Sequence, residues 1–350
     1  LMHLDNYNRS TILALKNKCW QTGKIPKQWK EANVACLYKK GDDGLPANYR
    51  PISLLSVLYK LLARMIQSRM ATSMDSFIRA TQHGFRQKRS TQTPIHLVYR
   101  AQEFFQKTGK PLFLMFLDWK MAFDRIDHTA LLQSLRRMGL PSEYLNIIGD
   151  IYQDPFFTVQ GLGLEGQRGK SSAGIRQGCP LSPYLFVIVM SLIMQDSEKL
   201  LREECIPLNT WSKYKDCFDC EYADDTLLVA QTTQQMQSIF SAVEKTALRY
   251  GLHLNKDKTL LLRCLDPLDP SDHTAEPLAV SHTANIDPVY FADSTKVPQT
   301  FDGSIIYLGA KISADCRQNP NITMRLGKAT SEFKKLSNVW NSTLSKKLRV

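Results

Sequence analysis

The chain has 350 residues, of which 43% are hydrophobic and 22% charged, and its formal net charge is +12 at pH 7. These values are ordinary for a folded protein with two or three subdomains and a large core. No apolar stretch is long enough to span a bilayer and the N-terminus lacks a signal-peptide pattern, so no membrane partner is expected. Because the chain begins with Leu1 rather than Met, we expect it to be either a piece of a longer polyprotein or a predicted gene fragment.

Charge changes sign along the chain. Residues 1–112 carry 19 Lys and Arg against 6 Asp and Glu, residues 113–315 carry 18 against 26, and residues 316–350 carry 8 against 1. Basic flanks around an acidic middle are typical of a protein that grips a polyanion and holds cations at its centre. The alternative is that the Lys and Arg side chains only solvate helix surfaces.

The eight cysteines show no disulfide-framework spacing, which favours a reducing, intracellular compartment. Cys217 and Cys220 form a lone C-x-x-C without a second pair or a His partner at zinc spacing. We therefore interpret this segment as part of a buried strand rather than a zinc site.

In chain order, the pattern predicts a strand over 29–38, a turn over 39–44 and a hairpin candidate over 156–174. It predicts helices over 5–23, 51–72 after a short extended entry, 91–108, 128–139, 183–204 and 233–250. Residues 265–303 hold five of the sixteen prolines and are expected to be a loop-like insertion. From Ile322 onward, the spacing predicts a basic amphipathic helix.

Two acidic segments carry the chemistry. The apolar run 111–117 is typical of a strand buried on both faces, and it ends at Asp118. Tyr222-Ala223-Asp224-Asp225 is predicted to form the tip of a β-hairpin; such an acidic turn, taken alone, is usually only a solvated turn. If the two strands are neighbours, Asp118, Asp224 and Asp225 converge, and three carboxylates suit a two-ion site for displacement at phosphorus.

Seven motifs now occur in order. "FLDWKMAFDRIDH", "GIRQGCPLSPYLF", "YADDTLLVA", "GLHLNKDKT" and "YLG" resemble successive palm motifs of reverse transcriptases. Upstream, "WKEANVACLYKKGDDGLPANYRPISLLSVLYKLLARMIQSRM" and "QHGFRQKRST" are similar to the fingers region of non-LTR (LINE-type) retrotransposon reverse transcriptases. The resemblance covers roughly residues 20 to 340.

This resemblance implies an α+β right-hand polymerase fold, with an antiparallel palm sheet packed on helices and a truncated helical thumb. The implied domains are an N-terminal extension and fingers over 1–111, a palm over 112–315 that includes the 265–303 insertion, and the start of a thumb over 316–350.

The resemblance implies that Asp118 and Asp224 bind two Mg²⁺ ions, with Mn²⁺ as an alternative, and that Asp225 completes the acidic set. Lys258 matches a lysine expected near the leaving pyrophosphate as a general acid. Asp124 and Asp127 are expected instead to cap the following helix.

A nucleotide pocket is implied as well. Phe123 is expected to stand against the sugar and exclude a ribose 2′-hydroxyl, while Gln177 and Gly178 lie near the nucleotide or template base. Arg176 is expected to add a phosphate contact. Four further cations are expected in the fingers, where each taken alone is as consistent with a surface charge as with a triphosphate contact: Lys39, Arg50, Lys60 and Arg86.

Tyr307, Leu308 and Gly309 resemble a primer grip, and Tyr222 is expected beside the primer or template; a core hairpin is the alternative for the first three. The implied partners are an RNA template, a DNA primer, dNTPs and other domains of a longer retrotransposon polyprotein, with the nucleus as the place of retrotransposition. No endonuclease constellation, RNase H segment or zinc knuckle is evident in the sequence.

Two other functions remain open at this point. A domesticated or decayed module would bind RNA without polymerising, but such a module loses its metal carboxylates, which are all present here. An RNA-dependent RNA polymerase usually carries Gly-Asp-Asp and lacks a bulky sugar gate, so Ala223 and Phe123 disfavour it. Group II intron reverse transcriptases and telomerase are relatives within the favoured class.

Overall fold

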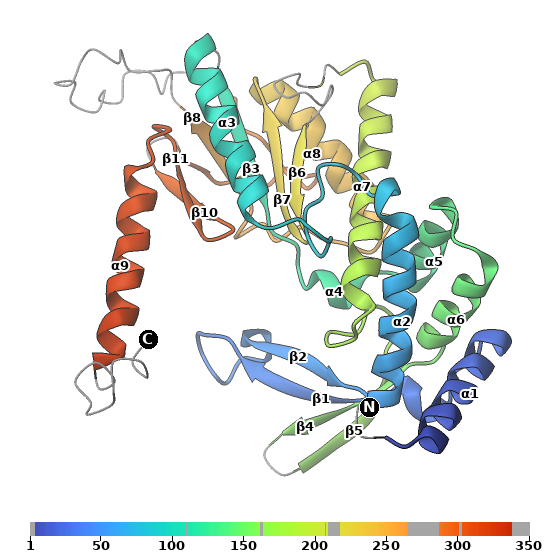
Figure 1. Cartoon of the computed structure of the whole chain (residues 1–350). Helices are drawn as coiled ribbons and strands as arrows, with labels where there is room; N and C mark the ends of the chain where they lie inside the picture. Colours follow the sequence, from blue (N-terminus) through green and yellow to red (C-terminus); the bar gives the residue numbers. More distant parts are fainter. Residues whose placement is uncertain are drawn as a thin grey trace.

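The computed structural model describes residues 4–109, 111–161, 164–206, 208, 218–264, 287–300 and 303–337. Within them, helices surround a five-stranded sheet, a four-stranded sheet and a two-stranded hairpin (Figure 1). The α+β class predicted from the sequence is confirmed. In these parts of the chain, no helix combines the length and the apolar character needed to cross a bilayer.

The five-stranded sheet forms the centre of the molecule. Its order is β6 (Asp219–Tyr222), β7 (Asp225–Ala230), β3 (Leu112–Leu117), β8 (Leu260–Cys264) and β9 (Gln299–Thr300). Strand β3 is antiparallel to β7 on one side and to β8 on the other, and every residue of β3 is buried. The unbroken apolar run of this segment is therefore explained by burial on both faces.

Side chains of β3 alternate between two hydrophobic clusters. Phe113, Met115 and Leu117 pack with α7 (Ser182–Glu203) and α8 (Thr233–Leu248). Leu112, Leu114 and Phe116 pack with α3 (Gln92–Thr108) and with the hairpin of β10 (Ser304–Tyr307) and β11 (Ala310–Ser313). Each fully buried Leu or Met side chain contributes about 1.5–3 kcal/mol, so these two clusters hold the sheet in place.

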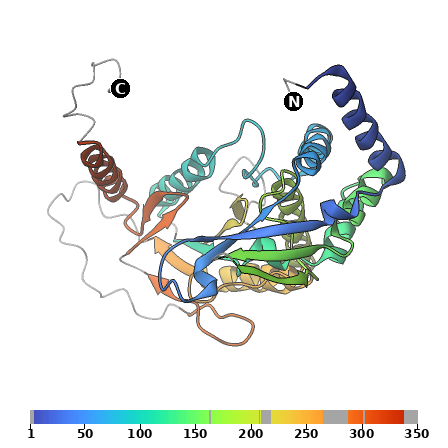
Figure 2. The same cartoon turned by 90° about the horizontal axis from the view of Figure 1, so that it is seen from below.

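The four-stranded sheet has the order β2 (Tyr49–Leu54), β1 (Glu31–Tyr38), β4 (Phe156–Gly161) and β5 (Leu164–Lys170). Strand β1 is antiparallel to β2 and parallel to β4 (Figure 2). The predicted 156–174 hairpin thus exists, but it joins the sheet of the fingers segment although it lies far downstream in the chain. A short 3-10 turn, Lys27–Lys30, takes up Trp29, so strand β1 begins two residues later than predicted.

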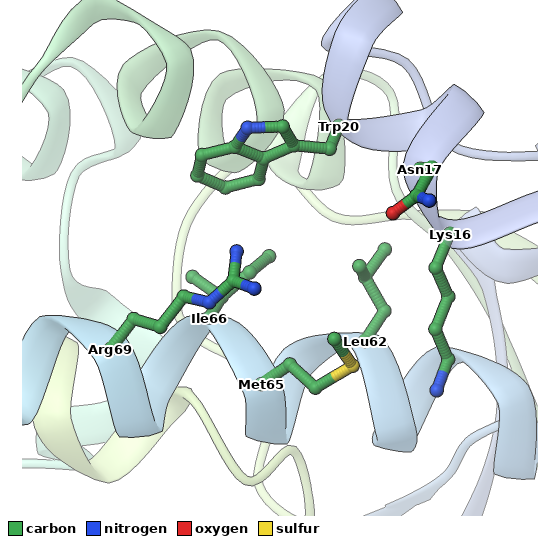
Figure 3. A pocket seen from close by; sticks show the side chains of 7 residues that line it. All are labelled: Lys16, Asn17, Trp20, Leu62, Met65, Ile66 and Arg69. Atoms are coloured by element: carbon green, nitrogen blue, oxygen red, sulfur yellow. The ribbon is translucent and has the colours of Figure 1, made fainter. Parts of the chain in front are cut away.

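Helices α1 (Asn6–Thr22) and α2 (Val57–Met74) flank this sheet, and Gly23 ends α1 in the left-handed conformation, as the sequence predicted. A cavity of about 50 Å³ lies between the two helices (Figure 3). Trp20, Leu62 and Arg69 are among its lining, and the Arg69 guanidinium lies over the Trp20 ring at 5.9 Å. The lining contains none of the residues predicted to carry chemistry.

Three helices connect β3 to β4: α4 (Ala122–Arg125), α5 (His128–Arg137) and α6 (Ser142–Tyr152). Asp127 caps α5 by accepting a bond from Ala130 N at 2.7 Å, which confirms its predicted role. The same prediction was wrong for Asp124, which lies inside α4 and accepts two bonds from Gln177. Helix α6 and strand β8 were not predicted.

The second half of the predicted insertion is packed against the core. Val289, Phe291 and Val297 are buried in the cluster of α7 and α8, and β9 pairs in parallel with β8. Residues 265–286 lie outside the described residues, as does Cys217 of the C-x-x-C segment. Cys220 is buried in β6, as expected. Helix α9 (Asn319–Lys335) follows β11 and matches the predicted basic helix.

Candidate active site

Strand register brings the two acidic segments to one end of the central sheet. Leu117 pairs with Thr226, so Asp118 at the end of β3 lies next to the beginning of β7, where Asp225 stands. Trp119 reinforces this junction, because its Nε1 donates to Thr226 Oγ1 over 3.2 Å. The two strands are therefore neighbours, and the charge of Asp118 acts on both Asp224 and Asp225.

Asp224 sits in a tight turn between β6 and β7. Tyr222 pairs with Asp225 across the hairpin, and Ala223 adopts the left-handed conformation with φ 58°. This conformation is uncommon for residues other than glycine. Ala223 is buried, whereas Asp224 and Asp225 on its C-terminal side are exposed to solvent.

Burial and acidic neighbours raise the pKa of Asp224 and Asp225. Partial burial, then Asp224, then Asp118 raise the pKa of Asp225 to about 6. Partial burial and Asp118 also raise the pKa of Asp224, an effect that Arg50 opposes. Both side chains still reach water, so part of this repulsion is screened by solvent. The site attracts protons or cations.

Asp118 is held by two residues of the "LNKDKT" motif. Asn255 Nδ2 donates to Asp118 Oδ2 over 2.9 Å, and Asn255 N donates to Asp118 O over 2.7 Å. Lys258 Nζ lies 3.9 Å from the same Oδ2 atom. The sequence motif predicted a role for Lys258 but not for Asn255. The only indication of Asn255 in the sequence was its position in the same motif.

The acidic set fits divalent cations by its chemistry. Carboxylate oxygens are the ligands that Mg²⁺ prefers, and a cation would relieve the repulsion that raises the pKa of Asp225. Among the described residues, no three His, Cys, Asp or Glu side chains lie close enough together to hold a metal ion. One oxygen of Asp118 faces Asn255 and Lys258, so a cation would compete with these groups for it.

Phe123 and Gln177 belong to two of the motifs that follow Asp118 in the chain, and each contacts a second protein side chain. The Phe123 ring is half-buried and stacks on Phe186 of α7, with centroids 4.5 Å apart and an interplanar angle of 7°. Gln177 Nε2 donates to both carboxylate oxygens of Asp124, and the Gln177 backbone oxygen accepts a hydrogen bond from Ser53 N. Next to it, Gly178 has φ 107°, and a Cβ there would come within 2.7 Å of Ser53 O.

The five predicted phosphate-binding cations separate into two groups. Lys39 and Arg50 are exposed on the β1–β2 hairpin, and their charges act on Asp124 and Asp224 respectively. Lys60 is half-buried on α2, and its amine has no hydrogen bond or ion pair within the described part of the chain. Arg86 and Arg176 belong to the second group.

Both of these arginines are buried and bound to protein groups. Arg86 donates to both oxygens of Asp75, and Arg176 donates to the backbone oxygens of Trp29 and Lys30 at 2.8 and 2.7 Å. Their guanidinium groups thus stabilise the fold. Arg86 and Arg176 therefore drop out of the nucleotide site that the sequence suggested.

The β10–β11 hairpin lies against the central sheet on the α3 side. Tyr307 is buried, its ring contacts Phe116, and its hydroxyl donates to Cys220 O over 3.4 Å. Leu308 and Gly309 form the turn with φ 48° and 80°. Tyr222 is half-buried at the end of β6. The Tyr307 side chain is thus a core contact, whereas the turn that follows it is accessible.

A mainly antiparallel sheet that carries three carboxylates at one end, together with a second sheet bearing exposed cations, is the arrangement expected of right-hand nucleotide polymerases. Residues 37–312 match the family described as reverse transcriptase (RNA-dependent DNA polymerase). The chain belongs to the reverse transcriptase family.

Its relatives are mobile-element proteins, and its domain is of the non-LTR retrotransposon type. It is 28% identical over 240 residues to the transposon TX1 149 kDa protein of Xenopus laevis, covering 67% of this chain and 18% of that protein. It is 27% identical over 251 residues to the RNA-directed DNA polymerase of mobile element jockey of Drosophila melanogaster, covering 69% and 26%. It is 26% identical over 245 residues to the R2 retrotransposable-element Pol polyprotein of Nasonia vitripennis, covering 69% and 23%. The chain thus spans about a quarter or less of these relatives.

Among solved structures, the fold is similar to telomerase of Candida tropicalis in complex with a TWJ fragment of telomeric RNA. The TM-score is 0.54 at 12% sequence identity, over 87% of this chain and 47% of that one. The apo telomerase of the same organism gives a TM-score of 0.53 at 11% identity, over 89% and 53%. These similarities confirm the right-hand polymerase fold.

Proposed function

We propose that this chain is the polymerase domain of an RNA-directed DNA polymerase, which extends a primer 3′-hydroxyl with dNTPs on an RNA template. The observation that carries the proposal is the meeting of Asp118 with Asp224 and Asp225 at one end of the sheet, with the pKa of Asp225 raised to about 6. Membership of the reverse transcriptase family selects this reaction from others that use paired carboxylates.

In the proposed reaction, Asp118 and Asp224 hold two Mg²⁺ ions and Asp225 adds negative charge beside them. Bound there, such ions acidify the primer hydroxyl and neutralise charge on the transferring phosphate. Lys258 lies on the Asp118 side of this set and donates a proton to the departing pyrophosphate. Arg50 and Lys39, exposed on the β1–β2 hairpin, bind the triphosphate.

The remaining proposed contacts concern the sugar, the bases and the primer. Phe123, braced by Phe186, excludes a 2′-hydroxyl. Gly178 allows the close approach of Ser53 O to the backbone, and Gln177 beside it contacts the nucleotide or template base. Tyr222 and the Tyr307–Gly309 hairpin support the primer end. In domain terms, 1–111 would be the fingers with an N-terminal extension, 112–315 the palm and 316–350 the start of a thumb, with β4–β5 contributed by the palm segment to the fingers sheet.

Primer extension tests the proposal. Purified protein is given a DNA primer on poly(rA) or a natural RNA template with dNTPs and Mg²⁺, alongside Asp224→Ala and the control Asp287→Ala. Asp287 is exposed and lies in the 287–300 segment, so its variant removes one carboxylate without touching the proposed site. We expect extension by the wild type and Asp287→Ala and its loss in Asp224→Ala; equal activity in all three would contradict the proposal.

A module that binds RNA without polymerising is the second candidate, and the basic N-terminal third of the chain favours RNA binding in either case. Binding through Lys and Arg to phosphates weakens steeply as salt rises. RNA binding with this salt dependence, combined with absence of extension at every Mg²⁺ or Mn²⁺ concentration, would favour the module over the polymerase.

A further inference from the structure

Residues 81–84, just upstream of α3, run beside β6 as a short additional strand. Gln82 forms an isolated parallel bridge with Glu221. Glu221 N donates to Thr81 O over 2.9 Å, and His83 N donates to Glu221 O over 2.8 Å. This segment therefore extends the central sheet at the edge strand that leads into the acidic turn.

The Gln82 side chain is fully buried and its amide is used on both sides. Its Oε1 accepts bonds from Ala223 N at 2.9 Å and from Gly84 N at 2.8 Å. Its Nε2 donates to Glu221 Oε2 at 2.7 Å and to Ala223 O at 3.3 Å. One side chain thus satisfies both backbone groups of Ala223, the residue before Asp224.

The turn needs such support for two reasons. Ala223 has φ 58°, a conformation that costs free energy for a residue with a Cβ. The carboxylates of Asp224 and Asp225 that follow it repel each other. Packing is tight as well: a Cβ on Gly84 would lie 2.2 Å from Ala223 N, so only glycine allows this approach.

A buried polar network fixes the segment that carries Gln82. Arg79 donates to Glu198 of α7 at 2.5 Å and to Asp219 at 2.6 Å, and Thr81 Oγ1 donates to Asp219 at 2.7 Å. Burial and the neighbouring Asp219 raise the pKa of Glu221 well above its usual range, which favours the protonated form of Glu221 beside the Gln82 amide.

We infer that Gln82 is a positioning residue, which holds the Ala223–Asp224 turn in the geometry that polymerisation requires. This inference rests on the proposed function. Because Gln82 is fully buried, it would act through the backbone of Ala223 and not by direct contact with nucleotide or primer. Replacing Gln82 should leave the fold intact but make the Ala223–Asp224 turn more mobile. The effect should therefore be measurable at the turn itself.

Amide hydrogen exchange gives the first test and needs neither substrate nor metal. In Gln82→Met, which keeps the volume but removes the four bonds, we expect the Ala223 amide to exchange at least about tenfold faster. Gln102→Met is the matched control, because Gln102 is also buried and donates to Ser313 O, away from the turn. Melting temperatures of both variants show that they are folded.

Primer extension gives the second test. We expect Gln82→Met to need several-fold more Mg²⁺ for half-maximal rate and to lose kcat, with little change in KM for dNTP, while Gln102→Met keeps the wild-type Mg²⁺ requirement. If Gln82 only supported the fold, Gln82→Met would lower the amount of active protein without shifting the Mg²⁺ requirement.

The conservative variant Gln82→Glu adds a pH signature. Burial should raise the pKa of the introduced carboxyl, although the Arg86 guanidinium bound to Gln82 O opposes this rise, and only the protonated form can both donate and accept as the amide does. Activity relative to wild type should therefore be highest at the acid end of the profile and fall as pH rises.

Each outcome decides. Unchanged Ala223 exchange in folded Gln82→Met, or an unchanged Mg²⁺ requirement with a flat relative pH profile in Gln82→Glu, overturns the inference and leaves the proposed function standing. If wild-type protein fails to extend primers, the proposed function falls, and the exchange rates alone decide whether Gln82 holds the turn.

Discussion

Gln177 Nε2 donates to both oxygens of Asp124, at 3.0 Å and 2.9 Å, and so joins two motifs that are 53 residues apart. Burial raises the pKa of Asp124, while the bond from Gln177 and the charge of Lys39 oppose this rise. The pair links α4, which carries Phe123, to the loop before α7. A nucleotide that contacts Gln177 would therefore meet an amide whose donor is already engaged and whose Oε1 is left to accept.

Stability without divalent ions should depend on the protonation of Asp225. Its pKa is raised from the ordinary 3.8 to about 6 in the folded chain, so the stabilisation is complete below about pH 4 and is lost as pH rises through about 6. The melting temperature of the wild type should fall over this window relative to that of Asp225→Asn, and Mg²⁺ at pH 7.5 should raise it more in the wild type. Parallel curves for the two proteins would contradict the electrostatic account of the site.

Phe123→Val should weaken discrimination between dNTPs and rNTPs by roughly 10- to 100-fold, because a smaller side chain leaves room for the 2′-hydroxyl. Single-nucleotide extension with each sugar measures the ratio. Phe186→Leu is the control, since it disturbs the ring stack but keeps the Phe123 side chain. An unchanged sugar ratio in Phe123→Val would eliminate the gate assignment.

Lys258 can act as a proton donor or merely as a positive charge 3.9 Å from Asp118. Lys258→Arg separates these roles, because arginine keeps the charge but hardly releases a proton. If Lys258 is a general acid, its replacement by Arg or Ala should lower the rate of nucleotide incorporation by roughly 10²- to 10⁴-fold, as measured by pre-steady-state kinetics. Lys256→Arg in the same motif is the control. A wild-type rate in Lys258→Arg would show that Lys258 acts only through its positive charge.

Two arginines of the N-terminal segment should respond in opposite ways. Arg86→Ala removes a buried guanidinium that binds Asp75, Arg79 O and Gln82 O, so the free energy of unfolding should fall by about 3–5 kcal/mol. Arg50→Ala removes an exposed side chain, so stability should change by no more than about 0.5 kcal/mol while KM for dNTP rises. Denaturant unfolding and dNTP titration measure the two effects. A stable Arg86→Ala protein with a raised KM would reverse the assignment made here.

Much of the fold could be predicted because its signals are local. The apolar run before Asp118, the Gly23 stop of α1 and the Asp127 cap of α5 each express the preference of a few neighbouring residues. Helix α6 was missed, and the packing of Val289 and Phe291 into the core was not foreseen in a segment rich in proline. Burial by distant elements decided both cases.

The sequence by itself determined the candidate catalytic residues: short motifs contain Asp118, Asp224 and Asp225, and the patterns around them predict the strands that hold them. Only the tertiary structure decided which charged and polar side chains were left free to act. It bound Arg86 and Arg176 to protein groups, joined Gln177 to Asp124, and brought Gln82 and Asn255 to the acidic turn and to Asp118. Apart from Arg86 and Asp75, these contacts join residues far apart in the chain. A polar group buried by such packing must find its partner within the protein, because water can no longer supply one.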